Sequence, residues 1–243
     1  MSSYTIALAG NPNTGKSTLF NTLTGLRQHT GNWAGKTVVM AEGEFARGNT
    51  TFRIIDLPGT YSLYSNSADE EVARDYIVFD QPDVTVVVLD ATSLERNLNL
   101  ALQVLEMTSR VVVCVNLIDE AKRLGIHIDL EKISKRLGVP CVAISARNQI
   151  GIENLLDQVE KVANGTIVPT PVQITYSDQI EAKLVELEPL IAKTMNRRFP
   201  TRWIALRLLD GDESLLKTLR ERMQEPAESF GEERLTHGQT VCH

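Results

Sequence analysis

Cysteine is scarce in this chain of 243 residues, which has only Cys114, Cys141 and Cys242. Two of them lie in apolar runs, so the sequence predicts a reduced, cytosolic protein without a disulfide framework. The chain also lacks a run of about 20 apolar residues, which a membrane-spanning helix needs, and its first residues show no secretory signal. These absences predict a soluble chain and disfavour the membrane-spanning and secreted classes.

A basic excess is missing as well, because 25 lysines and arginines stand against 31 aspartates and glutamates, for a net charge of −6. Residues 1–168 carry 15 basic and 19 acidic residues, and the remainder carries 10 and 12. Nucleic-acid binding depends on neutralising phosphates, so an acid excess in both parts disfavours it. We therefore expect no nucleic-acid partner.

Strand-like and helix-like segments alternate through the first two thirds of the chain. Continuous Val-rich runs at 85–89 and 111–115 are typical of strands that are covered on both faces of a parallel sheet. The β-rich runs 36–45 and 51–56, separated by Arg47-Gly48-Asn49, predict an antiparallel hairpin. The pattern predicts an α/β fold: a doubly wound, mostly parallel sheet with one antiparallel edge hairpin.

The pattern changes after Gly165, where residues 166–171 form a short joint rich in proline and threonine. Apolar residues at helical spacing then predict three helices, the first of them kinked or divided by Pro189. The segment Asp210-Gly211-Asp212 separates the other two. The predicted organisation is a domain at 1–168, a small helical domain at 169–228 and a mobile tail at 229–243.

A phosphate-binding pattern, G-x-x-x-x-G-K-[ST], spans Gly10 to Ser17 between an apolar strand and a helix. Its backbone N–H groups and the helix N-terminus favour phosphate. Lys16 would bridge the β- and γ-phosphates, and the Ser17 hydroxyl would bind Mg²⁺. The residues expected to bind nucleotide here are Gly10, Asn11, Pro12, Asn13, Thr14, Gly15, Lys16, Ser17 and Thr18.

Three further loops narrow the nucleotide to GTP or GDP. In Asp56-Leu57-Pro58-Gly59, the aspartate would hold Mg²⁺ and the Gly59 N–H would reach the γ-phosphate. In Asn116-Leu117-Ile118-Asp119, the carboxylate can accept two hydrogen bonds from guanine, which adenine does not present in that arrangement. Ser145-Ala146-Arg147 would offer N–H groups to the base. The expected binding residues in these loops are Asp56, Leu57, Pro58, Gly59, Asn116, Leu117, Asp119, Ser145, Ala146 and Arg147.

These motifs resemble those of the translation-factor-related class of P-loop GTPases. Leu117 stands where that class usually has a lysine that stacks on the base, so we expect weaker affinity, and some use of ATP stays open. Gly31-Asn32-Trp33-Ala34-Gly35 and Asp-Leu-Pro-Gly-Thr-Tyr-Ser-Leu at 56–63 narrow the resemblance to the N-terminal cytosolic part of the FeoB family, bacterial ferrous iron transporters.

The resemblance implies a P-loop GTPase fold followed by a helical domain that acts like a guanine-nucleotide dissociation inhibitor. It further implies a slow GTPase that uses Mg²⁺ and regulates Fe²⁺ transport at the cytoplasmic face of the bacterial inner membrane. The partner would be a polytopic membrane domain of the full-length transporter, through which an oligomer could form.

The family also implies potassium activation. Thr60 occupies the position of the water-orienting glutamine of regulatory GTPases, so K⁺ would supply the missing charge, bound by Asn13, Gly31 and Trp33. Thr37 matches the threonine that completes Mg²⁺ coordination, and catalytic roles would fall to Asn13, Lys16, Thr37 and Gly59. The residues alone leave Asn13 open as a turn-former and Thr37 as an ordinary strand residue.

Two other functions remain open from the sequence. A stand-alone K⁺-dependent GTPase that acts on RNA or ribosomes would use the same loops, although the acid excess disfavours it. A switch that binds GTP and GDP with negligible hydrolysis is compatible with Thr60 in place of glutamine. We expect the transporter GTPase.

Overall fold

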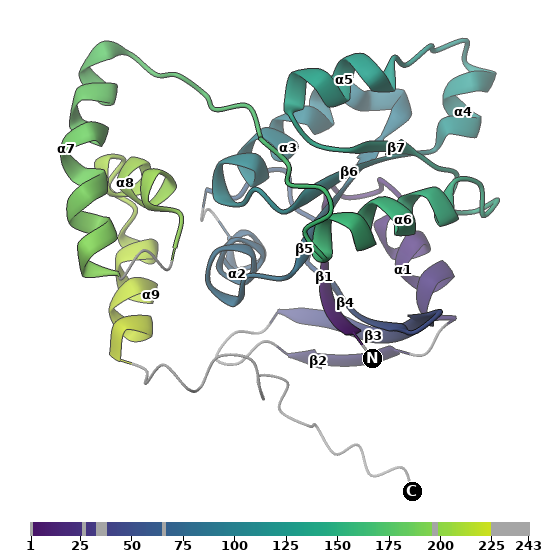
Figure 1. Cartoon of the computed structure of the whole chain (residues 1–243), viewed down its shortest axis with the longest axis horizontal. Helices are drawn as coiled ribbons and strands as arrows, with labels where there is room; N and C mark the ends of the chain where they lie inside the picture. Colours follow the sequence, from purple (N-terminus) through teal and green to yellow (C-terminus); the bar gives the residue numbers. More distant parts are fainter. Residues whose placement is uncertain (1, 26–27, 33–37, 65–66, 196–198, 225–243) are drawn as a thin grey trace, which may run out of the picture.

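The computed structural model describes residues 2–25, 28–32, 38–64, 67–195 and 199–224. An α/β unit comes first, and three helices at the C-terminal side pack beside it (Figure 1). The predicted tail at 229–243, Trp33 and Thr37 lie outside the described residues.

One seven-stranded sheet forms the centre of the α/β unit. Its strands are β1 (Ser2–Gly10), β2 (Gln28–Asn32), β3 (Val39–Arg47), β4 (Thr50–Asp56), β5 (Val84–Asp90), β6 (Val111–Asn116) and β7 (Cys141–Ala143). The order is β2-β3-β4-β1-β5-β6-β7, with β4 to β7 parallel and β3 antiparallel to both of its neighbours. This confirms a mostly parallel sheet with an antiparallel edge.

The edge is larger than the predicted hairpin, because β2 adds a third antiparallel strand. The sequence predicted no strand at Gly31, yet Gly31 pairs with Met40 of β3. Gln28–Asn32 has no apolar alternation of its own, so pairing with β3 rather than local pattern defines this strand.

The helices alternate with the strands and then continue alone. They are α1 (Lys16–Thr24), α2 (Ala68–Asp75), the π-helix η1 (Tyr76–Asp80), the 3₁₀-helix η2 (Ala91–Ser93), α3 (Leu94–Met107), α4 (Ile118–Arg123), α5 (Leu130–Leu137), α6 (Ile152–Ala163), α7 (Asp178–Thr194), α8 (Thr201–Leu209) and α9 (Glu213–Gln224). Ser67 caps α2 by accepting a hydrogen bond from the Glu70 N–H, and Asp69, Glu70 and Glu71 lie in the first turn of this helix, where negative charge is favourable.

Two apolar layers cover the sheet because successive strand residues point to opposite faces. Ile6 and Leu8 of β1 pack in one layer with α1 and α6, whereas Ala7 and Ala9 pack in the other layer with α2, α3 and the C-terminal helices. This second layer includes buried Trp203 of α8. The three C-terminal helices therefore share a core with the sheet.

Helix α7 is continuous although Pro189 lies inside it. Of the two predicted effects of this proline, division of the helix is wrong, and a kink stays a prediction. A proline removes one internal hydrogen bond, but Leu184 and Ile191 are buried on either side of it and hold both turns against the same core. Among the described residues, no helix is both long enough and apolar enough to cross a membrane.

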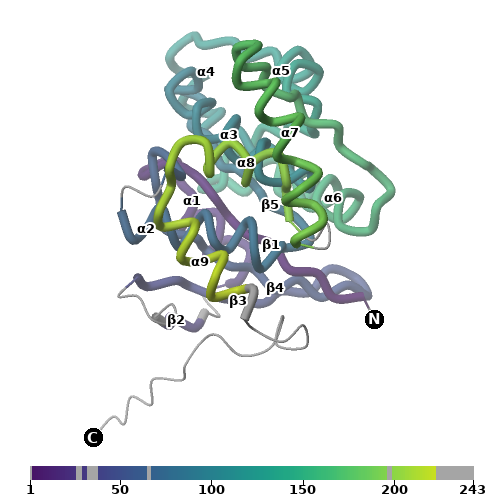
Figure 2. Tube along the Cα trace, turned by 90° about the vertical axis from the view of Figure 1, so that its left-hand side faces the viewer, coloured from purple at the N-terminus to yellow at the C-terminus, as the bar shows by residue number. Residues whose placement is uncertain are grey.

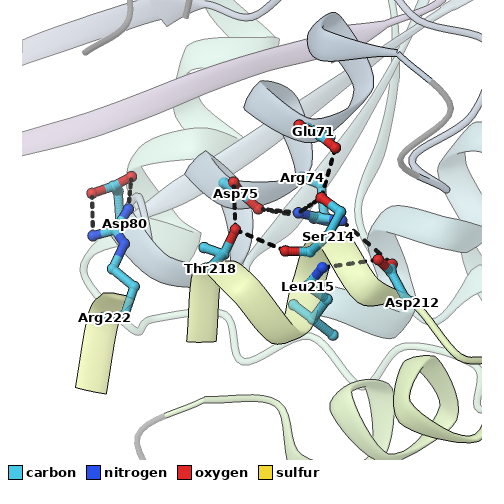
Figure 3. A network of polar contacts seen from close by, with 9 residues as sticks. All are labelled: Glu71, Arg74, Asp75, Asp80, Asp212, Ser214, Leu215, Thr218 and Arg222. Atoms are coloured by element: carbon cyan, nitrogen blue, oxygen red, sulfur yellow. Dashed lines mark hydrogen bonds and ion pairs between the residues drawn. The ribbon is translucent and has the colours of Figure 1, made fainter. Parts of the chain in front are cut away.

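Helix α9 runs alongside α2 and η1, as the side view shows (Figure 2). A polar network joins them (Figure 3). Arg74 of α2 is fully buried; it pairs with Asp75 at 2.7 Å and reaches Asp212 at 3.4 Å. Ser214 Oγ donates to Glu71 at 2.6 Å, and Arg222 pairs with Asp80 at 3.2 Å. We call the contacts drawn in Figure 3 the α2–α9 network.

Candidate nucleotide-binding site

The loop between β1 and α1 has the backbone that a phosphate-binding loop needs. Asn13 and Gly15 have φ values of 66° and 80°, in the left-handed region. A Cβ on Gly15 would lie 2.3 Å from Asn116 Nδ2, and one on Gly10 would lie 2.7 Å from the Val88 carbonyl oxygen. Both glycines are therefore required by the close approach of neighbouring strands, β5 at Gly10 and β6 at Gly15, as well as by the motif.

Lys16, Ser17 and Asp56 meet where this loop faces the end of β4. Lys16 Nζ donates to Asp56 Oδ1 and, at 2.5 Å, to the Leu57 carbonyl oxygen. Ser17 Oγ donates to Asp56 Oδ2 at 3.2 Å. A hydroxyl and a carboxylate within hydrogen-bond distance are hard oxygen ligands that fit Mg²⁺. The structure thus brings together the predicted phosphate lysine and two predicted Mg²⁺ ligands.

The loop after β4 packs directly on the phosphate-binding loop. The Leu57 N–H donates to the Leu8 carbonyl at 3.1 Å, and the Thr60 N–H donates to the Gly10 carbonyl at 3.3 Å. A Cβ on Gly59 would lie 3.5 Å from Pro12. Gly59 is therefore adjacent to the loop in which a phosphate would lie, as its predicted role requires.

Asn116 has a role that the sequence did not reveal. Its side chain is buried; Nδ2 donates to the Thr14 carbonyl at 2.9 Å, and Oδ1 accepts from the Ala146 N–H at 3.0 Å. It thereby ties the phosphate-binding loop to the loop after β7. Only the motif spacing pointed to this residue, because the partners lie 102 and 30 residues away in sequence.

The Asp119 carboxylate lies in the first turn of α4, two residues after Leu117, which has a φ of 61°. Its Oδ2 accepts from Asn148 Nδ2 at 3.0 Å, whereas its buried Oδ1 has no hydrogen-bond partner within the described part of the chain. The pKa of Asp119 is lowered, first by a hydrogen bond with the Ser145 side chain and further by neighbouring N–H groups and Asn148. The carboxylate is held in its charged form.

The loop after β7 is held to β6 by a backbone N–H group. Ser145 and Ala146 are buried, and the Ala146 N–H donates to Asn116; that N–H groups of this loop contact the base stays a prediction. Arg147 is exposed at the same loop. Asn148, which the prediction omitted, donates to Asp119, whereas the carbonyl of Thr14, which the prediction included, accepts from Asn116.

The predicted potassium ligands are only partly within the described residues. Asn13 is exposed, and its left-handed backbone already favours asparagine, which is the turn-forming interpretation. Gly31 lies in β2, and Trp33 lies outside the described ranges. Thr18 is exposed on the first turn of α1. The potassium site stays a prediction.

Four motifs meet at the carboxyl edge of one doubly wound sheet. They are the phosphate-binding loop after β1, Asp-x-x-Gly at the end of β4, Asn-x-x-Asp at the end of β6 and Ser-Ala after β7. This arrangement defines the fold class of the P-loop GTPases.

The sequence matches the family description "Ferrous iron transport protein B" over residues 4–159 and "FeoB cytosolic helical domain" over residues 176–237. The chain therefore belongs to the FeoB family. It is 36% identical to the Fe(2+) transporter FeoB of Salmonella typhimurium, over 100% of this chain and 33% of that protein. It thus spans about a third of the length of the curated relatives that it matches.

Solved structures of related proteins have the same fold. The cytosolic domain of the T. maritima FeoB iron transporter in a GDP form has a TM-score of 0.82 at 35% identity, covering 93% of this chain and 87% of that one. The cytosolic domain of L. pneumophila FeoB has a TM-score of 0.79 at 35% identity, covering 93% and 91%.

Proposed function

We propose that this chain binds GTP and GDP with Mg²⁺ and hydrolyses GTP slowly, as the regulatory part of a ferrous iron membrane transporter. The contact of Lys16 and Ser17 with Asp56 carries the proposal, because it places a phosphate-binding cation beside two Mg²⁺ ligands. The GDP form of the T. maritima relative supports guanine nucleotide as the ligand.

Each side chain would have the role that its position in the site allows. Lys16 would exchange its contacts with Asp56 and the Leu57 carbonyl for the β- and γ-phosphates, and the loop N–H groups would surround the phosphates. Bound Mg²⁺, held by Ser17, Asp56 and Thr37, would neutralise phosphate charge. The Gly59 N–H would orient the γ-phosphate, and Asp119 would accept hydrogen bonds from guanine.

Potassium stimulation is part of the proposal and rests on the family resemblance. A monovalent cation prefers neutral oxygen ligands, which the Asn13 side chain and the backbone at Gly31 and Trp33 would offer. Its charge would act where regulatory GTPases use an arginine. Thr60, which follows Gly59, has no side-chain amide to orient water and is buried against the phosphate-binding loop.

The helical part supports a regulatory role through its contacts. Helix α2 follows Gly59 closely in the chain and is fastened to α9 by the α2–α9 network (Figure 3). Tyr64 lies between Gly59 and α2 in the chain. The guanidinium carbon of Arg207, in α8, lies over the Tyr64 ring, 4.6 Å from the ring centre. Movement of the loop at Gly59 would therefore be passed to α8 and α9.

We assign the nucleotide-binding domain to 1–168 and the helical domain to 169–228. Because the relatives are about three times longer than this chain, we propose that the partner is the membrane domain of the same transporter, at the cytoplasmic face of the bacterial inner membrane. The helical domain would slow GDP release.

The test is phosphate release from GTP with Mg²⁺ in matched KCl and NaCl buffers, with ATP in parallel. We expect GTP to be the better substrate and KCl to accelerate it, and Asn13→Ala to lose that acceleration while still binding GDP. Equal acceleration of wild type and variant would contradict the role of Asn13. GDP binding without turnover in either salt would favour the binding-only switch.

A further inference from the structure

Asn148 holds the guanine-reading carboxylate from the protein side. Its Nδ2 lies 3.0 Å from Asp119 Oδ2 and also 3.0 Å from Ser145 Oγ. A primary amide nitrogen carries two hydrogens, so it can donate to both oxygens at once. The Ser145 hydroxyl then keeps its own hydrogen for the Asp119 carboxylate, whose pKa it lowers. The three side chains are therefore joined by hydrogen bonds.

The other carboxylate oxygen is left for a ligand. Asp119 Oδ1 is buried and has no hydrogen-bond partner among the residues that the structure describes. A buried acceptor without a donor is costly, and a base that offers N–H groups would remove that cost. Leu117 has an apolar side chain, so polar support for the carboxylate comes from Ser145 and Asn148.

The loop that carries Asn148 is closed by its backbone and does not depend on this side chain. The Ser145 N–H donates to the Ile150 carbonyl at 3.0 Å, and the Ile150 N–H donates back to Ser145 at 3.1 Å. The Asn148 N–H also donates to the Ser145 carbonyl at 3.1 Å. A change of the Asn148 side chain should thus alter the carboxylate contact and leave the loop closed.

We propose that Asn148 is a positioning residue for base specificity: it fixes the Asp119 carboxylate so that both N–H groups at the guanine edge can bind together. The inference rests on the proposed guanine-nucleotide function and deepens it. It assigns selectivity for the 2-amino group of guanine to the Asn148–Ser145–Asp119 set.

The test compares the dissociation constants of GDP and inosine diphosphate, which lacks the 2-amino group, by calorimetry. For Asn148→Ala we expect GDP binding to weaken about tenfold, the size of one lost hydrogen bond to a charged group, and inosine diphosphate binding to change much less. Asn148→Asp keeps the side-chain size but sets a second carboxylate against Asp119, and it should weaken GDP at least as much. Asn164→Ala removes an asparagine that accepts from a loop N–H elsewhere and serves as the control.

The outcomes separate the inference from the function on which it rests. An unchanged ratio of the two dissociation constants in both variants, whether or not the melting temperature falls, would overturn the positioning role alone. A wild-type chain that binds ADP as well as GDP would overturn the proposed function and this inference with it. A fall in the dissociation constant of inosine diphosphate divided by that of GDP, in Asn148→Ala or Asn148→Asp, would support the role if this ratio is unchanged in Asn164→Ala.

Discussion

Every residue of β5 from Val84 to Leu89 is buried, whereas the longer helix α7 buries only Leu184 and Ile191. The sheet is thus held by apolar side chains on both faces, each contributing about 1.5–3 kcal/mol on full burial. The helical part contributes a narrower apolar stripe and is fastened to α2 by charged groups. The comparison teaches that the site's framework rests on non-directional burial, while the helical part adds particular polar contacts to the apolar core that it shares with the sheet.

Removing the buried centre of the α2–α9 network should have the largest effect. Arg74→Ala leaves Asp75 buried without its guanidinium, and we expect the free energy of unfolding to fall by about 3–5 kcal/mol. Arg74→Lys keeps the charge but not the planar fork, so its loss should be intermediate. Urea unfolding followed by circular dichroism measures both.

Arg123→Ala is the matched control for Arg74. Arg123 is 73% exposed on α4 and pairs with Glu120 at 3.5 Å, so its removal should change stability by less than about 0.5 kcal/mol. Equal losses in the two variants would show that burial of the network carries no special stability.

Loss of the second arginine in the network should act more locally. Arg222 is 5% exposed, pairs with Asp80 and lies 5.4 Å from the centre of the Phe79 ring. We expect Arg222→Ala to cost about 1–2 kcal/mol, so that amide hydrogens of α9 exchange about 5–30 times faster. Arg220→Ala changes an exposed arginine of the same helix and should leave the exchange unaltered.

Acid should weaken one contact within the helical part. The pKa of Glu181 lies below its ordinary value of 4.5, first because Arg202 hydrogen-bonds to it. Its contribution to stability is therefore present above about pH 4.5 and is lost as the pH falls through the lower, folded-state pKa. Glu181→Gln should lower the melting temperature at neutral pH and match wild type in stronger acid. A Glu186→Gln control, in which an exposed residue of α7 is changed, should follow wild type throughout.

The smallest effect is expected at an exposed pair of the α/β unit. Lys135 and Glu131 of α5 lie 2.8 Å apart and are 75% and 80% exposed. Lys135→Ala should change the free energy of unfolding by at most about 0.5 kcal/mol, because water and salt screen the pair. A loss as large as that of Arg222→Ala would end the distinction between the two regions.

Much of the fold followed from patterns that are local in the sequence. The Val-rich runs at 85–89 and 111–115 predicted strands that are covered on both faces of a parallel sheet, and both are confirmed as the buried strands β5 and β6, which pair with each other. Strand β2 escaped prediction because its residues acquire strand structure only by pairing with β3. Pro189 was predicted to kink or divide α7; it does not divide the helix, because burial on both sides of the proline outweighs one lost hydrogen bond.

The candidate site likewise contains some contacts that the sequence predicted and others that only the structure shows. Lys16, Ser17 and Asp56 were expected to meet because each follows or ends a strand at one edge of a parallel sheet, and the structure places them in contact. The bridge made by Asn116 and the support that Asn148 gives to Asp119 depend on which loops lie side by side, and no spacing in the sequence encodes that.

The sequence by itself determined the periodicity of strands and helices and the order of four motif loops, because side-chain type sets local backbone preference and spacing. The tertiary structure alone decided which helix covers Arg74, where the Ala146 N–H donates and which oxygen of Asp119 stays unpaired. These are contacts between segments far apart in the chain, and their energies exist only once burial has excluded water from around them.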